Sequence, residues 1–487
     1  MTAHLVMKTE DIPAFSVVDL AEQLKARRAQ GARVLSLFGR KGEGEVVVTV
    51  VLLSPGVGLQ LLRTTLDASA KHRSLTASFP EMHIFERELT EALGVRFTDH
   101  PWLKPVRFPS WAGRRMEEHP FFKLEGKEVH EVGVGPVHAG VIEPGHFRFS
   151  CLGELVHHLE IQLGYQHRGA ESLLLQRPPT SLAPLVESLA GDTSVAHVAA
   201  YCRAVEALAG IPPDDDAALV TAVANELERM AMHLAGLSGI ATDVGFLPGS
   251  STYGRLRTAV INLSMRLCGS RFSRGWFRPG GPRRGISAEA LADIRSTLTA
   301  VAHDFHTIHE HMFSAASVRE RLVGTGILTT AQATEMGVVG MVGRASGRAV
   351  DLRTELPGAP FTRHPLPTTV EPAGDCWSRA MIRARELPAS LEWILRALKD
   401  RTEVPVRKVA MGALASSTLA VAVTEGWRGE VVHALETGPE GKLVHYRVQD
   451  PSLRNWFGLA LAVRNNDIYD FPICNKSFDL SYCGHDL

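Results

Sequence analysis

Apolar and polar residues follow two different patterns along this chain, and the change between them divides it into two parts. Near the N-terminus, short segments of period two alternate with segments of helical period. They predict helices over residues 15–28, 58–72 and 84–93, and strands over residues 33–38, 45–53 and 75–78. Residues 98–130 show no sustained period, which indicates a connector. We therefore expect a small α/β sandwich-like domain over residues 1–110 and a linker over residues 111–130.

Helical periods dominate the second part of the chain. They predict helices over residues 182–189, 194–209, 215–240, 251–267, 288–313, 330–336 and 375–398. Two hairpins are predicted beside them, from alternating segments at 129–134 and 145–150 and from 429–436 and 442–448 around a Gly-Pro-Glu-Gly turn. The expected fold is α+β, with a large, mostly helical domain carrying short antiparallel sheets over residues 131–487.

Composition narrows the range of partners. The 487 residues are 45% apolar, and 52 basic residues nearly balance 53 acidic ones, so the charge predicts no nucleic-acid partner. The longest apolar run, Val46–Leu53, is far shorter than the roughly 20 residues that span a bilayer. The N-terminal residues carry no signal-peptide pattern, so we expect a cytoplasmic location.

Six cysteines lie at positions 151, 202, 268, 376, 474 and 483, and no two of them form a Cys-x-x-Cys pair. In a reducing compartment such cysteines are expected to be buried thiols. The pattern predicts no iron–sulfur cluster held by this chain, and it assigns no role to Cys474 or Cys483.

Residues 78–97 read Ser-Phe-Pro-Glu-Met-His-Ile-Phe-Glu-Arg-Glu-Leu-Thr-Glu-Ala-Leu-Gly-Val-Arg-Phe. Taken singly, Glu86, Arg87 and Glu88 fit a capped surface helix equally well. The whole string, in register, resembles the signature of the 30-kDa-type subunit of respiratory complex I. In that family a helix opened by proline packs on the sheet and ends at a glycine.

A second resemblance covers about residues 130–487. Gly135-Pro-Val-His138, Glu143-Pro-Gly-His146-Phe-Arg-Phe149 and His167-Arg168-Gly-Ala-Glu171 resemble motifs of the large subunit of [NiFe] hydrogenases and of the 49-kDa-type subunit of complex I. The resemblance implies that the first loop lies over a redox cavity. It makes His138, His146 and Arg168 candidates for binding a quinone-type cofactor. The alternative is that both histidines are turn residues that hold backbone carbonyl groups.

The family places a Cys-Gly-x-Cys motif where this chain reads Ala190-Gly-Asp-Thr193, and a second cysteine pair where it has Ser481 and Gly484. The metal ligands are absent, so the resemblance predicts no nickel–iron centre and no metal ligand in this chain. The tyrosine that complex I uses would fall near Gly191, which leaves Tyr201 or Tyr482 as substitutes or as core residues.

Two more candidates come from the same resemblance. His197 follows the Ala190–Thr193 segment at the family's spacing, and Arg344 stands in an Arg-x-Ser-Gly segment that would line the cavity. With His138 and Glu171 they complete the candidate catalytic set. Four histidines between residues 301 and 313 have no cysteine near them, so we expect an ordinary polar helix face there.

A fusion of both types is typical of the large subunits of formate hydrogenlyase and hydrogenase-4-like complexes, here in a branch without nickel ligands. The resemblance implies an oxidoreductase subunit peripheral at the inner face of the plasma membrane. Its expected partners are a small [4Fe–4S] subunit and antiporter-like membrane subunits, and its expected acceptor is a quinone. Two alternatives stay open: a redox-silent scaffold of the complex, and a genuine hydrogenase.

Overall fold

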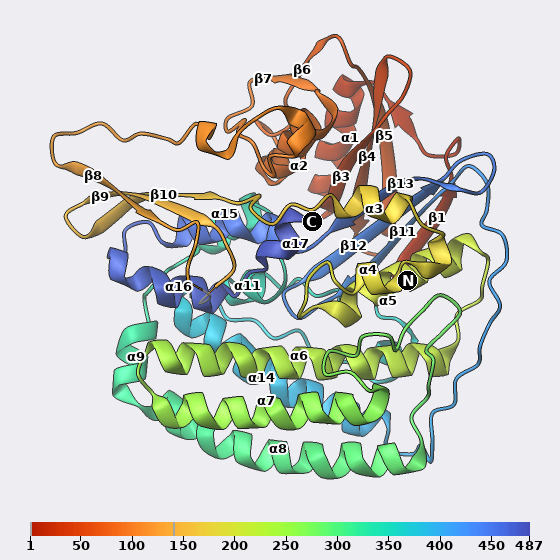
Figure 1. Ribbon diagram of the computed structural model, residues 1–487, viewed down its shortest axis with the longest axis vertical. Helices are drawn as coiled ribbons and strands as arrows, with labels where there is room; N and C mark the ends of the chain where they lie inside the picture. Colours follow the sequence, from red (N-terminus) through yellow and green to blue (C-terminus); the bar gives the residue numbers. More distant parts are fainter. Residues whose placement is uncertain (1, 140–141) are drawn as a thin grey trace.

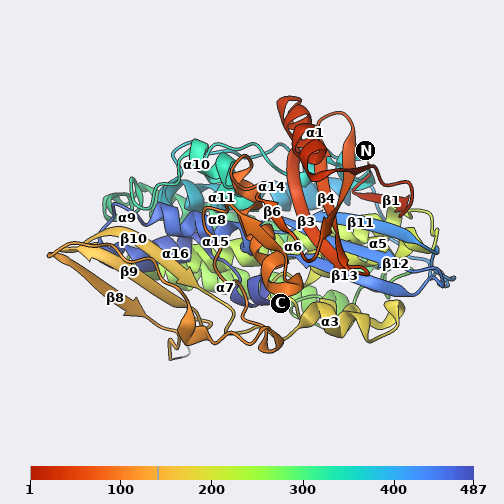
Figure 2. The ribbon, with the colours of Figure 1, turned by 90° about the horizontal axis from the view of Figure 1, so that it is seen from above.

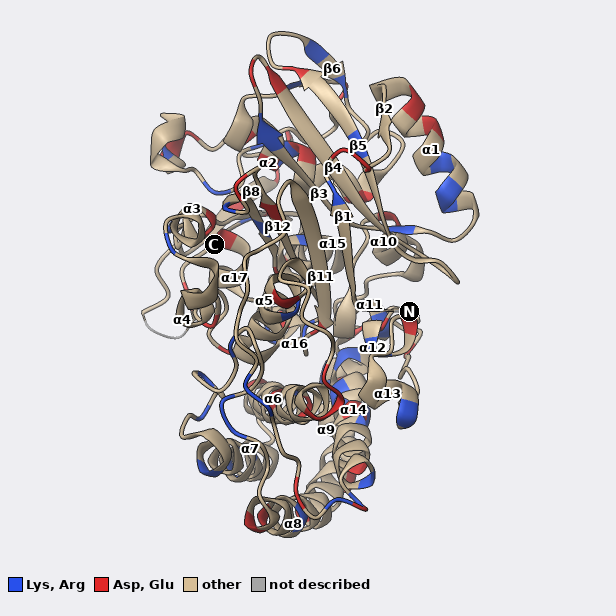
Figure 3. Cartoon of the chain, turned by 90° about the vertical axis from the view of Figure 1, so that its right-hand side faces the viewer, with Lys and Arg blue, Asp and Glu red and all other residues tan. Residues whose placement is uncertain are grey.

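The computed structural model describes residues 2–139 and 142–487, and its architecture is α+β, as the sequence predicts. Three layers lie one above another in Figure 1, with the N-terminal unit at the top, a sheet and short helices in the middle, and long helices at the bottom. A separate three-stranded sheet projects to one side of the molecule (Figure 2). Acidic and basic positions are interspersed over the N-terminal unit and the long helices (Figure 3).

The N-terminal unit has its own core. Its sheet has the strand order β2 (Ala14–Phe15), β5 (Gly58–Asp67), β4 (Glu45–Ser54), β3 (Arg33–Lys41). Helices α1 (Val17–Ala29) and α2 (His83–Leu93) pack against it through buried leucines and phenylalanines. Ser16 caps α1 by accepting a hydrogen bond from the Asp19 backbone N–H, and Gly94 ends α2 in the left-handed conformation. These two helices and strands β3 and β4 confirm the corresponding predictions.

Residues 58–72, by contrast, do not form the predicted helix. They form β5, which pairs with β4 from Glu45 opposite Asp67 to Ser54 opposite Gly58, and the short strand β6 (Lys71–Arg73), which pairs with β7 (Arg96–Thr98). Adjacent leucines 61 and 62 are both buried, because the sheet is covered on both faces. This removes the alternation that identifies a strand from its sequence.

The strand predicted over residues 75–78 is also wrong. This segment is a turn, whose backbone N–H groups at Leu75 and Thr76 donate hydrogen bonds to the buried carboxylate of Glu86. In a strand these two N–H groups would donate to a neighbouring strand. Here the Glu86 carboxylate accepts both hydrogen bonds, so the segment is stable without a partner strand.

The middle layer is a four-stranded antiparallel sheet. Its order is β1 (His4–Lys8), β11 (Thr418–Glu425), β12 (Glu430–Thr437), β13 (Leu443–Gln449). The hairpin of β12 and β13 confirms a prediction, whereas β1 and β11 have no counterpart in the sequence analysis. Because β1 pairs with β11, the first residues of the chain belong to the sheet of the second part and not to the N-terminal unit.

The side sheet contains the second predicted hairpin. β8 (Val129–Val134) pairs with β9 (His146–Leu152), and β10 (Leu155–Gln162), which was not predicted, adds a third antiparallel strand. The loop between β8 and β9 carries the Gly-Pro-x-His motif. Two of its residues, Gly140 and Val141, lie outside the described part of the chain.

Long helices form the bottom layer. They are α6 (Asp215–Asp243), α7 (Leu247–Cys268), α8 (Ala288–Ser314) and α14 (Cys376–Ala397), and with α5 (Ser194–Leu208) above them they confirm the predicted helical segments. Side-chain caps at Asp214, Ser287 and Asp375 begin three of these helices. The helix predicted over residues 182–189 is shorter, at α4 (Ala183–Val186).

Short helices connect the layers. They are α3 (Ala170–Leu175), α9 (Ala316–Leu322), α10 (Thr330–Glu335), α11 (Gly340–Ala345), α12 (Leu352–Glu355), α13 (Ala359–Arg363), α15 (Ser452–Ala462), α16 (Phe471–Phe478) and α17 (Tyr482–Asp486). Within the described residues, none of the helices, long or short, has both the length and the apolar content to cross a bilayer.

An ion cluster joins the N-terminal unit to the second part of the chain. Glu88 on α2 pairs with Arg447 on β13 and with Arg107, whose Nη1 lies 2.5 Å from the carboxylate. Arg107 also donates to the carbonyl oxygen of His485 in the C-terminal segment, at 2.8 Å. Burial opposes ionisation of Glu88, but the two guanidinium groups outweigh it and hold the pKa of this carboxyl below its ordinary value.

Replacing Glu88 is therefore expected to loosen the junction. Glu88→Gln leaves the buried guanidinium of Arg107 without its counter-ion and Arg447 with only Glu171, 3.4 Å away, which costs about 3 to 5 kcal/mol of unfolding free energy. Because the pKa of Glu88 is depressed in the folded state, its contribution is present above the ordinary carboxyl pKa of about 4.3 and is lost as pH falls through the folded-state value. Urea unfolding followed by circular dichroism between pH 3.5 and 7 measures both effects.

Glu22→Gln is the matched control, since Glu22 forms an exposed pair with Lys25 on α1. Such pairs contribute at most about 1 kcal/mol. Equal unfolding free energies for the two variants at pH 7 would contradict the assignment of Glu88 to the junction.

Candidate functional site: a buried histidine chain and its charged neighbours

Four side chains form a continuous hydrogen-bonded chain between α5 and the middle sheet. His197 Nε2 lies 3.1 Å from Asp450 Oδ2, and His197 Nδ1 lies 3.1 Å from His433 Nε2. His433 Nδ1 in turn lies 2.9 Å from the hydroxyl oxygen of Tyr446. All four residues are at most 1% exposed. We call Tyr446, His433, His197 and Asp450 the histidine chain.

With both imidazoles neutral, only one arrangement of protons satisfies every contact. Tyr446 donates its O–H to His433, His433 donates Nε2–H to His197, and His197 donates Nε2–H to the carboxylate of Asp450. Burial lowers the pKa of His433 and raises the pKa of Tyr446, so both stay neutral. Burial also opposes ionisation of Asp450, but the hydrogen bond from His197 outweighs it and lowers the pKa of Asp450.

The carboxylate of Asp450 lies against the C-terminal segment. A Cβ atom placed on Gly484 would lie 2.6 Å from Cγ of Asp450, so this carboxylate fills the space that a side chain at 484 would need. The backbone N–H of Ser452 donates to the same carboxylate at 2.8 Å. A cysteine at 484 would therefore require Asp450 to move.

The other positions at which the resemblance would place nickel ligands are also engaged in hydrogen bonding or in packing. The hydroxyl of Thr193 accepts from Arg428 at 3.2 Å, and that of Ser481 accepts from the Gly484 N–H at 2.9 Å as the cap of α17. Ala190 is fully buried and offers no donor atom. Cys483 Sγ lies 3.5 Å from the hydroxyl oxygen of Ser481, and burial raises the pKa of its thiol.

A buried arginine, Arg428, lies between the segment around Thr193 and the C-terminal segment. Arg428, which is 4% exposed, lies 2.5 Å from Asp192 and 3.9 Å from Asp479. Glu228 lies nearby on α6 and accepts the first N–H groups of α5, at Val195 and Ala196. Burial raises the pKa of Glu228 to about 8, so this carboxyl exchanges its proton near neutral pH.

Glu171 and Arg168 make no hydrogen bond with His197 or with any other member of the histidine chain. Glu171, in the first turn of α3, accepts the Val448 N–H at 2.9 Å and lies 3.4 Å from Arg447, the two residues that follow Tyr446 on β13. Arg168 is exposed, and its guanidinium donates to the carbonyl oxygens of Ser188 and Leu189.

His138 and His146 hold their own loop together. His138 Nε2 lies 2.8 Å from the carbonyl oxygen of Gly145, and His146 Nδ1 lies 3.2 Å from that of Gly135. In this conformation both rings bind backbone carbonyl groups, which matches the alternative interpretation of these residues as turn residues. The loop nevertheless covers the C-terminal segment, since a Cβ on Gly145 would lie 2.8 Å from the Tyr482 ring.

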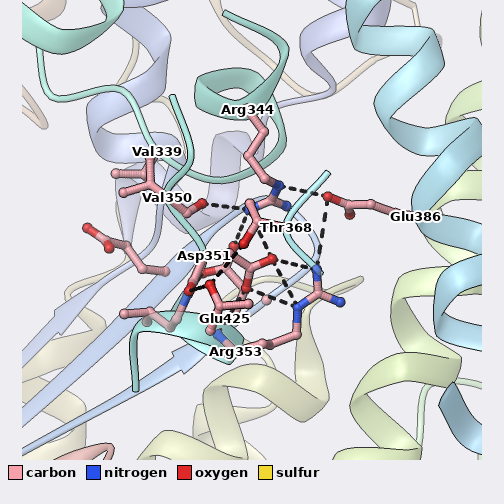
Figure 4. Close-up of polar contacts among 12 residues, drawn as sticks. Val339, Arg344, Val350, Asp351, Arg353, Thr368, Glu386 and Glu425 are labelled. Carbon is pink, nitrogen blue, oxygen red and sulfur yellow. Dashed lines mark hydrogen bonds and ion pairs between the residues drawn. The ribbon is translucent and has the colours of Figure 1, made fainter. Parts of the chain in front are cut away.

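Arg344 lies in a separate buried network, shown in Figure 4. Its guanidinium lies 2.7 Å from Glu386 and 2.8 Å from Glu425. Arg353, Asp351, Glu226, Arg229 and His233 extend the network. Burial and the nearby Asp351 raise the pKa of Glu425 to about 7, which relieves the excess of carboxylates over guanidinium groups. Nε and Nη1 of Arg344 bind Glu386, Glu425 and the carbonyl oxygen of Val350, whereas its Nη2 is buried without a hydrogen-bond partner among the described residues.

The structure therefore brings His197 into a hydrogen-bonded site and Glu171 to the neighbouring strand, whereas the other candidates, His138, His146, Arg168 and Arg344, bind other segments. His433, Tyr446, Asp450 and Glu228 were not predicted, because each is an ordinary polar residue in its own segment. The one available signal was the unusual presence of His433 within a β-branched and alanine-rich strand, where a buried imidazole needs a partner.

The large cavity near this region is not part of the site. It has a volume of about 410 Å³ and lies between α5, the N-terminal half of α6 and the loop at 277–282. None of the predicted site residues lines it. Among residues 2–139 and 142–487, no group of three or more His, Cys, Asp or Glu side chains is arranged to hold a metal ion.

Comparison with known proteins agrees with this two-part architecture. Residues 11–125 match the family described as respiratory-chain NADH dehydrogenase, 30 Kd subunit, and residues 243–418 match respiratory-chain NADH dehydrogenase, 49 Kd subunit.

Among curated proteins, formate hydrogenlyase subunit 5 of Escherichia coli is 28% identical over 481 residues, covering 93% of this chain and 84% of the relative. The NADH-quinone oxidoreductase C/D protein of Bacteroides thetaiotaomicron is 26% identical, and the match covers 75% of each chain.

A solved structure shares the fold. A chain of the membrane-bound sulfane sulfur reductase, an archaeal respiratory membrane complex, superposes with a TM-score of 0.69 at 23% identity, covering 74% of this chain and 99% of that chain. The chain thus fuses complex I-type domains of the 30-kDa and 49-kDa kinds, and formate hydrogenlyase subunit 5, hydrogenase-4 component G and the NADH-quinone oxidoreductase C/D protein are among its homologues.

Proposed function

We propose that this chain is a nickel-free electron-transfer subunit of a membrane-associated redox complex, and that it forms a site for a quinone-like acceptor together with a small iron–sulfur subunit. Homology to subunits of hydrogenase and NADH-quinone oxidoreductase complexes supports the oxidoreductase class. The observation that carries the finer proposal is the histidine chain, which ends at Asp450 directly beneath the positions where the family binds nickel.

The donor set does not fit a nickel–iron centre. Nickel–iron chemistry needs four thiolates from two segments, and the equivalent positions here are Ala190, Thr193, Ser481 and Gly484. The two hydroxyl oxygens are hard donors already engaged in hydrogen bonds, and Asp450 occupies the space next to Gly484. No step of the proposed reaction therefore passes through nickel.

Quinone reduction needs two electrons and two protons. In the proposal the electrons come from the [4Fe–4S] cluster of the partner subunit, while this chain supplies protons. The pair of His197 and the Asp450 carboxylate takes up a proton and passes it to the reduced acceptor, and two rounds of uptake supply both protons. His433 and Tyr446 are positioning residues, because they fix the tautomer of His197 and Tyr446 keeps its own proton.

The remaining candidates have supporting roles in this proposal. His138 lies in the loop that covers the C-terminal segment, so a small movement of that loop would free its Nε2 for an acceptor oxygen. Glu171 holds β13 through the Val448 N–H, and Arg344 pairs with Glu386 in the neighbouring buried network. Antiporter-like membrane subunits are the proposed attachment to the inner face of the plasma membrane.

Removing the charge of Asp450 tests the proton role. In the purified complex, Asp450→Asn keeps the shape of the side chain but removes its negative charge and leaves one acceptor oxygen where His197 and the Ser452 N–H now use two. The rate at which menadione oxidises the reduced clusters is expected to fall by about a hundredfold, with a changed pH profile. Glu440→Gln, an exposed carboxylate on the β12–β13 turn, is the matched control and keeps the parental rate.

The cluster-oxidation rate of the variants, measured on intact complexes, distinguishes this proposal from a redox-silent scaffold. If Asp450→Asn, His138→Ala and Glu171→Gln all leave cluster oxidation unchanged while the complex stays intact on gel filtration, the subunit acts as a scaffold and the proposed site is wrong. Tyr446→Phe adds a second readout: it shifts the pH dependence of the rate if His433 orients His197, and leaves it unchanged otherwise.

Metal analysis tests the loss of nickel. Because four thiolate positions carry other residues, plasma mass spectrometry of the purified complex is expected to find well under about 0.1 equivalent of nickel per chain, which reflects the missing soft ligands. Iron from the partner cluster serves as the internal standard. Nickel near one equivalent would identify a genuine hydrogenase subunit.

A further inference from the structure

Two cysteines outside the proposed site lie side by side in the core. Cys376 is the first residue of α14 and Cys474 lies on α16, and their Sγ atoms are 3.9 Å apart. Both side chains are completely buried and both are free thiols. The two residues are 98 positions apart, so only the fold brings them together.

A buried cation faces this pair. Arg379 is fully buried and stacks on the Phe478 ring with 4.4 Å between its Cζ and the ring centroid. Its guanidinium donates to the carbonyl oxygens of Gly374 and Gly326, and Nη2 lies 3.3 Å from Cys376 Sγ. Among the residues that the structure describes, it has no carboxylate partner within 4.0 Å, in contrast to the arginines of the Arg344 network. A buried guanidinium needs a counter-ion, and the Cys376 sulfur is the group in place to be one.

Three further features favour the thiolate form of Cys376. It occupies the N-terminal turn of a helix of 22 residues, where a negative charge is stabilised. Ser477 Oγ lies 3.5 Å from its sulfur. Burial opposes ionisation, but the hydrogen bond with Cys474 and the Arg379 charge outweigh it and lower the pKa of Cys376 to about 6, while the pKa of Cys474 is raised. The pair thus consists of one thiolate and one thiol.

A glycine packs directly against the two sulfurs. A Cβ atom placed on the buried Gly326 would lie 2.5 Å from Cys474 Sγ, 3.0 Å from Arg379 Nη2 and 3.5 Å from Cys376 Sγ. Gly324 and Ile327, in the same loop, are exposed, with Ile327 at 45%. A small molecule would therefore reach the pair only when this loop moves.

We propose that Cys376 and Cys474 are a peroxide-reactive dithiol that forms a reversible disulfide. The Cys376 thiolate attacks one oxygen of hydrogen peroxide, and the O–O bond breaks to give a sulfenic acid and hydroxide, which takes up a proton to become water. The Cys474 sulfur then attacks the Cys376 sulfur and expels a second water. Two thiols and one peroxide thus give one disulfide and two waters, and a dithiol reductant restores the thiols.

The oxidised pair would tie α14 to α16. Closing 3.9 Å to a bond of about 2.05 Å requires each sulfur to move by roughly 1 Å, which side-chain rotation can supply. Helix α16 leads directly into residues 479–487, which lie against Asp450 and Arg428. A disulfide between the pair would therefore anchor the helix that directly precedes the C-terminal segment, residues 479–487, of the proposed site.

Thiol mapping of the intact protein tests this inference. The full chain is treated with one to five equivalents of hydrogen peroxide, quenched, denatured and alkylated with N-ethylmaleimide. We expect two alkylation sites to be lost and a peptide cross-linked through Cys376 and Cys474 to appear, with oxidation at least about tenfold faster than at Cys483. The rate should reach half its maximum near pH 6, following the Cys376 thiolate, and dithiothreitol should restore both sites.

Two variants complete the test. Cys474→Ser should leave a sulfenic acid on Cys376 that dimedone traps, with no cross-link. Cys151→Ser, which removes a buried cysteine of the side sheet, is the matched control and should keep the cross-link. The inference is overturned if both sulfurs of the wild-type protein remain alkylatable at a peroxide dose that oxidises Cys483. This outcome is independent of quinone reduction, so it leaves the proposed function untouched.

Discussion

The structure depends on the pairing of charges that are buried between its layers. The long helices at the bottom and the sheet in the middle meet through Arg344, Glu386 and Glu425, and Arg353 continues the same network (Figure 4). A buried guanidinium without a counter-ion costs several kcal/mol, whereas a paired one with satisfied hydrogen bonds is tolerated and fixes the geometry of its neighbours. The charge pairs therefore determine how the layers are positioned against each other, while apolar packing provides most of the contact area.

The same physical requirement explains the proposed site. A fold that surrounds a metal must hold its ligands rigidly, and here the space beside Gly484 is taken by the carboxylate of Asp450. That carboxylate is buried, so it needs donors, and His197 and the Ser452 N–H supply them. His197 in turn needs a partner for its second nitrogen and finds His433. A hydrogen-bonded chain of this kind satisfies each buried donor and acceptor in turn.

The cysteine pair is a third case of charge compensation. Most buried arginines of the helical layer face carboxylates, whereas Arg379 faces two sulfurs. The difference matters because a thiolate is both a counter-ion and a nucleophile, and a carboxylate is only the former. The chain thus has redox chemistry available in its own side chains at a place separate from the histidine chain, and both places border the C-terminal segment.

The sequence by itself determined the division into two parts, most long helices and the two hairpins, because amphipathic periods, caps and turn residues are local signals. It also determined the family, through strings such as Gly135–His138 and His167–Glu171 that keep their order and spacing. It could not determine that residues 58–72 are strands, since burial on both faces erases alternation, nor that β1 pairs with β11 some 400 residues away. His197 was predicted by resemblance, but its partners Asp450 and His433 come from distant strands and loops. Only the tertiary structure decided which polar residues meet, because a buried hydrogen bond is specified by two segments together and by neither one alone.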